Sequence, residues 1–360
     1  MNPTRRNFLT VVGAAGTLAT LSSLRSVAQT PAGNPRRIDV HHHFVPDVYL
    51  AFEKAHDRAQ GNNQPWVLSK DMEDMDKAGT ATALLSITTP GFLFGETMEV
   101  RRVIRGCNEA AAKLAAEHRG RFGSFAAIPL QDTEGALKEL EYALDTLKAD
   151  GIGLFSNYGD KWLGYDVFNP VYEELNRRKA VVYVHPQAPA CCANMVKNVG
   201  DTWIEYGADT ARTIASLINS GSRTKYPDIT WIFSHAGGVM PFVVERFLGN
   251  TAEEIVPGIV TKGQGGTGVV GSGRTQNVPK ATLYEIRRMY YDTAQASNPV
   301  AMTALKSVAG TSQIVFGTDY WFRTAEETGR GLMTNKVFTD AELRAINRGN
   351  VERLLPKYKS

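Results

Sequence analysis

Cysteine is scarce in this sequence, with 3 residues in 360. Three thiols are too few for the disulfide framework of a small secreted domain. The fold must therefore depend on a hydrophobic core. Two of them are adjacent in the chain and poorly placed for an unstrained disulfide. A soft metal site would need cysteines separated by a gap. We therefore expect Cys107, Cys191 and Cys192 to be buried as small hydrophobic residues.

Net charge and long apolar runs are lacking as well. The formal charge is only +3, and the lysines and arginines are scattered rather than gathered in a basic stripe, which argues against nucleic-acid binding. No stretch of about 18 uninterrupted apolar residues could span a bilayer. We expect no membrane association once the N-terminal segment described next is removed.

A targeting segment opens the chain. Thr4-Arg5-Arg6-Asn7-Phe8-Leu9 is a twin-arginine pattern, and it precedes a modestly apolar stretch and the small-residue cleavage site Ser26-Val27-Ala28. We expect residues 1–28 to be a signal peptide that the Tat export machinery recognises, and residues 29–36 to be a linker. The folded product is then expected in the bacterial periplasm.

Apolar strand-like runs alternate with amphipathic helical segments after the linker. The strand-like runs cover residues 37–44, 82–87, 122–128, 152–156, 181–185, 230–234, 289–293 and 313–317. The helical segments cover residues 96–118, 133–148, 171–179, 210–219, 240–248 and 299–307. Alternation of this kind predicts parallel strands joined by right-handed crossovers. The strand count favours an α/β fold, a closed (β/α)8 TIM barrel over residues 37–356.

An open doubly wound sheet is the alternative fold, and it would carry a glycine-rich phosphate turn after its first strand. Histidines stand there instead. We interpret residues 46–70, which follow the first strand, as an insertion that covers the mouth of the barrel.

Histidine or aspartate stands where several of these strands stop. The segments are Asp39-Val-His41-His42-His43, Val184-His185-Pro186, Ser234-His235-Ala-Gly-Gly238 and Gly317-Thr-Asp319-Tyr320. Because the carboxyl ends of barrel strands meet at one rim, these side chains can converge on a single point. This layout predicts a metal-dependent catalytic site.

The spacing of the histidines separates their roles. Side chains alternate faces along a strand, so His41 and His43 point the same way and can bind one cation, while His42 points away and packs. With His185 and Asp319 they form a three-histidine, one-aspartate set that suits Zn²⁺, with Mn²⁺ as the alternative. His235 is either a further ligand or a general acid/base. The fourth strand ends without a lysine to bridge two metals, so we expect one ion.

Together these motifs resemble the amidohydrolase superfamily, whose fold is the TIM barrel of metal-dependent hydrolases. Within it they are similar to the aminocarboxymuconate-semialdehyde decarboxylase branch, and especially to its 6-methylsalicylate decarboxylase-like members. The resemblance implies that His41, His43, His185 and Asp319 are metal ligands and that His235 is the catalytic histidine.

The resemblance also implies groups that contact the substrate. Arg246 matches an arginine that grips the substrate carboxylate in this branch and often reaches into the neighbouring subunit of a homodimer. Trp321 stands where proline is usual in the branch and is expected to contact the substrate by reshaping the pocket floor.

The expected activity is non-oxidative decarboxylation of a phenolic or related unsaturated carboxylic acid, a carboxy-lyase reaction. Either His235 or Asp319 would protonate the ring carbon. The alternative is hydrolysis of a lactone or amide, in which His235 activates water at the same site.

Overall fold

The computed structural model describes residues 34–58, 66–248 and 277–359. The signal peptide predicted for residues 1–28 and most of the predicted linker lie outside these residues. The described residues from Pro35 onward form one compact unit. Within the described residues, no helix is both long and apolar enough to cross a membrane.

All eight predicted strands are present and form one parallel sheet in the order β1-β2-β3-β4-β7-β8-β9-β10. Their bounds are β1 Arg37–His43, β2 Thr80–Ser86, β3 Phe122–Ala127, β4 Gly151–Phe155, β7 Val181–His185, β8 Thr230–Phe233, β9 Tyr290–Asp292 and β10 Ile314–Val315. A small antiparallel hairpin, β5 Asn157–Tyr158 and β6 Lys161–Trp162, follows β4.

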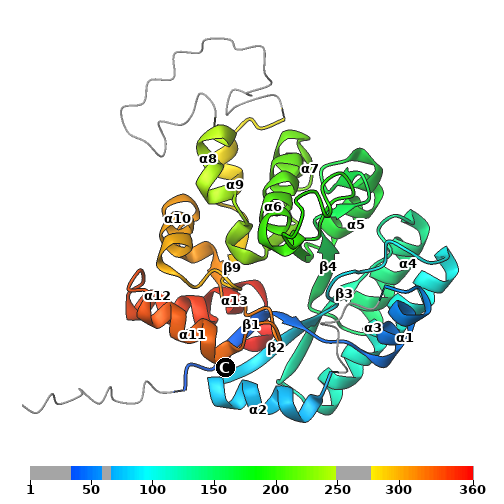
Figure 1. Cartoon of the computed structure of the whole chain (residues 1–360), viewed down its shortest axis with the longest axis horizontal. Helices are drawn as coiled ribbons and strands as arrows, with labels where there is room; N and C mark the ends of the chain where they lie inside the picture. Colours follow the sequence, from blue (N-terminus) through cyan, green and yellow to red (C-terminus); the bar gives the residue numbers. More distant parts are fainter. Residues whose placement is uncertain (1–33, 59–65, 249–276, 360) are drawn as a thin grey trace, which may run out of the picture. The chain divides into compact units, whose positions relative to one another are not determined.

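The two edges of the sheet meet. The amide of Val40 in β1 donates to the carbonyl of Phe316 just after β10 at 3.0 Å, and the amide of His43 donates to Tyr320 at 3.2 Å. The sheet is therefore a nearly closed barrel, which confirms the predicted fold class. Figure 1 shows the helices arranged around the strands.

The helices lie between and after the strands. Their bounds are α1 Asp47–Ala55, α2 Leu68–Ala78, α3 Thr97–Glu117, α4 Thr133–Glu141, α5 Asn169–Arg177, α6 Asp201–Asn219, α7 Ser222–Lys225, α8 Met240–Leu248, α9 Thr282–Ile286, α10 Pro299–Ala309, α11 Ala325–Thr334, α12 Asp340–Arg344 and α13 Asn350–Leu354. Two predicted helices differ in extent. The helix predicted over 133–148 becomes a π-turn from Tyr142, and the one predicted from 210 already begins at Asp201.

The described part of the segment predicted to cover the barrel mouth packs against α3. Tyr49, Leu50 and Phe52 of α1 are buried in one hydrophobic cluster with α3 residues such as Ile104. The Tyr49 hydroxyl also accepts from the amide of Gly91 at 2.8 Å. Apolar residues at helical spacing thus fix α1 against the flank of the barrel.

The interior of the barrel is filled by large side chains from several strands. Ile38, Leu84, Phe125, Tyr183 and Ile232 are all buried in one cluster. The rings of Phe125 and Tyr183 stack with centroids 5.2 Å apart. Because this layer closes the barrel interior, a ligand can reach the strand ends only from the rim above it.

The prediction that all three cysteines are buried is wrong for two of them. Cys107 is buried on α3, but Cys191 is exposed and Cys192 is half-buried in a turn after β7. The pair belongs to a loop rather than to a strand or helix that packs on the core, so its thiols reach the surface.

Candidate metal centre

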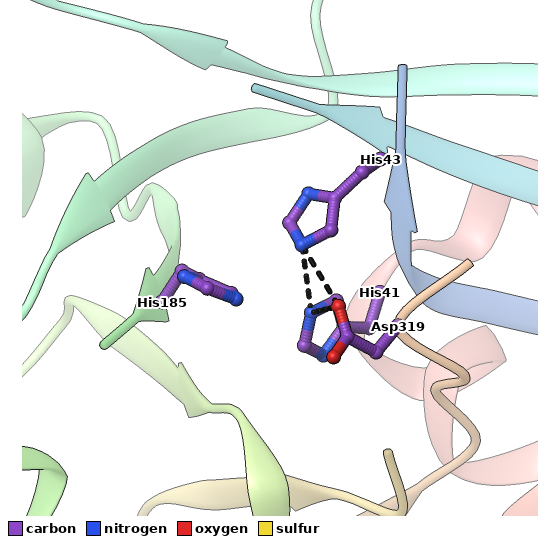
Figure 2. A group of neighbouring side chains, drawn as sticks. All are labelled: His41, His43, His185 and Asp319. Atoms are coloured by element: carbon purple, nitrogen blue, oxygen red, sulfur yellow. Dashed lines mark hydrogen bonds and ion pairs between the residues drawn. The ribbon is translucent and has the colours of Figure 1, made fainter. Parts of the chain in front are cut away.

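Three imidazoles and one carboxylate converge at the carboxyl ends of the strands. His41 and His43 come from β1, His185 from the last residue of β7, and Asp319 from the segment after β10. One ligand atom from each of the four residues lies within 4.8 Å of the others, and all four are buried. Figure 2 shows the four side chains pointing toward one point. The structure thus brings together the four residues predicted as metal ligands.

The distances within this cluster suit a cation. Asp319 Oδ1 lies 3.2 Å from His41 Nε2 and 3.1 Å from His43 Nε2, and the two Nε2 atoms are 3.1 Å apart. Ligands at the usual zinc distances are about 3.3 Å apart on a tetrahedron. Among the described residues, the buried atoms Asp319 Oδ1 and His185 Nδ1 have no hydrogen-bond partner. Orphaned buried polar atoms are costly, and a metal ion would satisfy them.

The protonation states of two imidazoles and the carboxylate favour metal binding. The third imidazole, His41, must give up a proton to the metal, because burial, which lowers its pKa, is outweighed by Asp292 and Asp319, which raise this pKa to about 10. Burial lowers the pKa of His43, and burial and the neighbouring imidazoles hold the pKa of His185 well below its usual value. Burial opposes ionisation of Asp319, but the adjacent histidines outweigh it and hold the pKa of this carboxyl well below its usual range. Neutral imidazoles beside an ionised carboxylate are the forms that bind a cation.

A β-bulge in β1 helps to aim the histidines. The pairing of β1 with β2 shifts register between Asp39 and His42, and the amide of His41 donates to its own strand neighbour Asp39 Oδ1 at 3.0 Å. Bulges redirect side chains in this way near functional sites.

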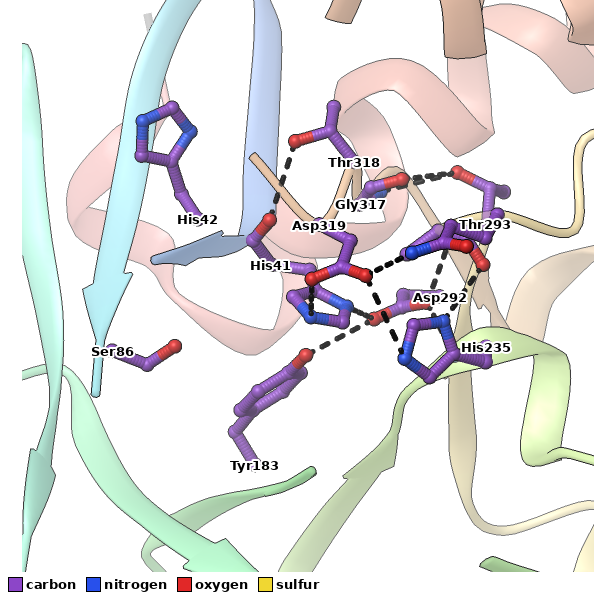
Figure 3. A network of polar contacts seen from close by, with 12 residues as sticks. His41, His42, Ser86, Tyr183, His235, Asp292, Thr293, Gly317, Thr318 and Asp319 are labelled. Carbon is purple, nitrogen blue, oxygen red and sulfur yellow. Dashed lines mark hydrogen bonds and ion pairs between the residues drawn. The ribbon is translucent and has the colours of Figure 1, made fainter. Parts of the chain in front are cut away.

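His42 lies on the opposite side of β1 from His41, as Figure 3 shows. Its Nδ1 is 3.1 Å from Asp39 and its Nε2 is 2.9 Å from Asp71 Oδ1. Its ring stacks on Tyr320 with centroids 4.4 Å apart. The prediction that His42 packs rather than joins the cluster is confirmed.

Asp292, at the end of β9, organises the centre and was missed by the sequence reasoning. Its fully buried carboxylate is 2.8 Å from His41 Nδ1, and it accepts from the Tyr183 hydroxyl at 3.3 Å. It also accepts from the amides of His235 at 2.8 Å and Ala294 at 2.9 Å. Figure 3 shows it between His41 and His235. Its signal in the sequence is the same as that of Asp319, a carboxylate that ends a barrel strand.

His235 lies beside the cluster, in a backbone conformation with φ of 52°. Its Nδ1 is 3.1 Å from the Ala294 carbonyl, and its Nε2 is 4.0 Å from Asp319 Oδ2. A hydrogen bond from Nδ1–H to this carbonyl leaves Nε2 free of hydrogen in the neutral ring. Burial lowers the pKa of His235, so the ring is neutral near pH 7 and can take up a proton.

The glycines after His235 allow α6 to pack closely against the end of β8. Gly238 has φ of 65°, and a Cβ there would lie 2.2 Å from the carbonyl oxygen of Gly207 in α6. Only glycine allows α6 to come this near to the strand end.

A cavity of about 520 Å³ opens over the centre. Its lining includes His185, His235 and Asp319. The other polar and aromatic lining residues come from α6 and from the segments after β2, β9 and Asp319: Thr88, Thr89, Thr202, Trp203, Tyr206, Gln295, Asn298, Phe322 and Arg323. A volume of this size holds a small organic ligand. Gln295 also donates a hydrogen bond to Asp319 Oδ2.

The two residues predicted to contact the substrate do not line this cavity in the described residues. Arg246 is exposed on α8. Trp321 is half-buried and packs against the cluster that holds α1 and α3. The next two residues, Phe322 and Arg323, line the cavity instead.

Comparisons with known proteins agree with this geometry. The family model described as Amidohydrolase matches residues 38–357. The chain is 35% identical to the 6-methylsalicylic acid decarboxylase of Penicillium expansum over 294 residues, which covers 79% of this chain and 84% of the relative. It is 28% identical to the gamma-resorcylate decarboxylase of a Rhizobium species over 48% of this chain and 56% of the relative.

Solved structures share the fold. The 5-carboxyvanillate decarboxylase of Sphingomonas paucimobilis superposes with a TM-score of 0.75 at 20% identity, over 89% of this chain and 99% of that one. A dihydroxybenzoic acid decarboxylase from Polaromonas with bound manganese superposes with a TM-score of 0.73 at 20% identity, over 90% of this chain and 98% of that one.

Proposed function

The chain belongs to the amidohydrolase family, and from this premise we propose that it is a metal-dependent, non-oxidative decarboxylase of phenolic carboxylic acids. The observation that carries the proposal is the buried cluster of three histidines and Asp319, open to a cavity, in a chain 35% identical to a 6-methylsalicylic acid decarboxylase.

One divalent cation would be held by His41, His43, His185 and Asp319. When bound, it supplies a Lewis acid that attracts the carboxylate and the adjacent phenolic oxygen of the substrate. We propose Zn²⁺, because imidazole-rich sets suit it. Mn²⁺ is the alternative, supported by the manganese in a structural neighbour.

The proton would pass through His235. Asp319 is committed to the metal cluster, because Gln295 donates to its Oδ2 and His41 and His43 lie 3.2 and 3.1 Å from its Oδ1. The Nε2 atom of His235 is the group beside Asp319 that can accept a proton and deliver it to the ring carbon that carries the carboxylate. The bond to the carboxylate then breaks, its electron pair returns to the ring, and carbon dioxide leaves. Asp319, the other predicted catalytic residue, would stabilise the positive charge on His235 once Nε2 has taken up a proton, since its Oδ2 lies 4.0 Å away.

A substrate screen tests this function. The metal-reconstituted protein is incubated with 6-methylsalicylate, 2,6-dihydroxybenzoate and salicylate, and carbon dioxide release and the phenol product are measured. We expect at least one acid to lose carbon dioxide and, in D₂O, to gain one deuterium at the former carboxylate position. No carbon dioxide from any of them at full metal occupancy contradicts the proposal, and uptake of water by a lactone or amide would favour hydrolysis.

The substrate anion would be recognised by Arg323 within one chain. Its side chain is 55% exposed, lines the cavity, and has a long 3.5 Å ion pair with Glu327 that leaves it free to turn inward. A guanidinium binds a carboxylate or phenolate through two parallel hydrogen bonds. We propose that Arg246 contacts the substrate only in a homodimer, in which it reaches the neighbouring subunit.

Replacing Arg323 by glutamine is expected to raise KM about tenfold and to leave kcat nearly unchanged, because the interaction stabilises bound substrate and transition state alike. Steady-state kinetics measure both constants. The control is Arg330→Gln on α11, whose side chain is 65% exposed and pairs with Glu326. If Arg246→Gln raises KM and Arg323→Gln does not, the contact across a dimer is the dominant one.

We also propose that the protein reaches the periplasm through the Tat pathway. The support is the twin-arginine pattern at Arg5-Arg6 and the cleavage site ending at Ala28.

A further inference from the structure

Two adjacent thiols lie in the loop that follows His185. Cys191 is exposed and Cys192 is half-buried. The amides of Cys192 and Ala193 both donate to the carbonyl of Pro189, at 2.9 and 3.0 Å, so the pair stands on one hydrogen-bonded turn. Contact with Cys191 raises the pKa of Cys192. Both thiols are therefore carried by one turn at the protein surface.

Because Cys191 and Cys192 are consecutive in the chain, a disulfide between them is disfavoured. Consecutive Cα atoms are about 3.8 Å apart across a trans peptide, whereas disulfides need about 4.4–6.8 Å. Direct oxidation would strain the turn, so the pair persists as a dithiol. An atom inserted between the sulfurs lengthens the bridge and removes this strain.

The surroundings limit which atom can be inserted. Among the described residues, three or more potential metal ligands come together at one place, the cluster of His41, His43, His185 and Asp319. The cysteine pair therefore has no third protein ligand there, and a structural zinc site needs four. A species satisfied by two sulfurs is required.

We propose that Cys191 and Cys192 form a two-sulfur binding site for thiophilic trivalent arsenic compounds, R–As(OH)₂. Two As–S bonds form, two As–O bonds break, and the two thiol protons leave with the hydroxyl groups as water. Arsenic stays trivalent, so no oxidant or reductant takes part.

The site is connected to the metal cavity. The amide of Asn194, at the end of the turn, donates to Asp201 Oδ1 at 2.8 Å, and Asp201 is the first residue of α6. Trp203 and Tyr206 in the first turns of α6 line the cavity. The ring of Tyr206 contacts His185 with centroids 6.1 Å apart. An arsenic bridge ties the two cysteine side chains together and so alters the conformation of the turn that is hydrogen-bonded to Asp201. We infer that this displaces the start of α6 and weakens substrate binding.

Phenylarsine oxide, which hydrates to the required species, tests the binding site on the metal-loaded protein. We expect one equivalent to bind, with loss of two titratable thiols and reversal by an excess of dithiol but not of monothiol. Cys191→Ser and Cys192→Ser should each bind about 100-fold more weakly, because one of two linked contacts is lost. Cys107→Ser, the control, should bind normally. Loss of a single thiol, or unchanged binding in either serine variant of the pair, overturns the proposal.

The effect of arsenic binding on the cavity is measured separately, through KM, and this measurement rests on the proposed function. With a decarboxylated substrate in hand, phenylarsine oxide should raise KM severalfold in the unmodified protein and leave the KM of Cys191→Ser unchanged. An unchanged KM in the fully loaded protein overturns the coupling. If no substrate is found, the thiol titration still decides the binding site, so the two failures are distinguishable.

Discussion

His185→Ala is expected to lower kcat/KM about 1000-fold or more and to reduce the bound metal below one equivalent. The imidazole is buried, and its Nδ1 has no hydrogen-bond partner among the described residues. A bound cation contributes several kcal/mol to charge stabilisation, and each 1.4 kcal/mol corresponds to about tenfold in rate. Elemental analysis and steady-state kinetics measure the two effects.

The truncation at His185 also leaves a cavity, so a second variant of similar size, His185→Gln, separates folding from metal binding. A ligand that binds only the native state raises the melting temperature. Added metal should therefore stabilise the unmodified protein and not His185→Gln. His56→Gln is the matched control, because His56 is half-buried and pairs with Glu99 rather than with the metal cluster. Full activity and full metal content in both His185 variants contradict the proposed centre.

Asp292→Asn is expected to weaken metal affinity about 10- to 100-fold, as does loss of other carboxylates behind metal-bound histidines. Asp292 Oδ2 lies 2.8 Å from His41 Nδ1. When a metal displaces one of the two ring protons, this carboxylate keeps the other on Nδ1, so that Nε2 binds the cation. An asparagine amide facing Nδ1 donates instead of accepting. The proton of His41 then moves to Nε2, which can no longer bind a cation. Competition with a metal chelator measures the affinity.

Asp71→Asn is the matched control for Asp292→Asn. Asp71 is also a fully buried carboxylate against a histidine, but it contacts His42 on the other side of β1. We expect this variant to lose stability and to retain its metal affinity. Excess metal should restore much of the kcat of Asp292→Asn. Equal affinities in both variants would show that Asp292 has only a structural role.

Much of the fold could be predicted from the sequence, because strands buried on both faces are short continuous apolar runs. All eight barrel strands lie where these runs predict them. Elements whose pattern is weak were harder to find. The first turns of α6 carry the exposed Trp203 and Ile204 and contain Gly207, so the sequence shows no clear amphipathic face there.

Contacts between distant segments were beyond the reach of sequence patterns. Arg323 lines the cavity, while Trp321, only two positions earlier, turns to the cluster beside α1. No periodic pattern distinguishes these neighbours in an irregular segment. The exposure of Cys191 likewise depends on where the loop after β7 runs.

The sequence by itself determined which residues could bind a metal. His41, His43, His185 and Asp319 end apolar runs, and barrel strands end at one rim. Only the tertiary structure decided how those side chains are oriented and protonated. Asp292, far from His41 in the chain, pairs with Nδ1 of that ring, and Arg323 rather than Arg246 lines the cavity. The physical reason is that strand position follows from local hydrophobic pattern, whereas hydrogen bonding and charge at a buried site depend on neighbours brought together by folding.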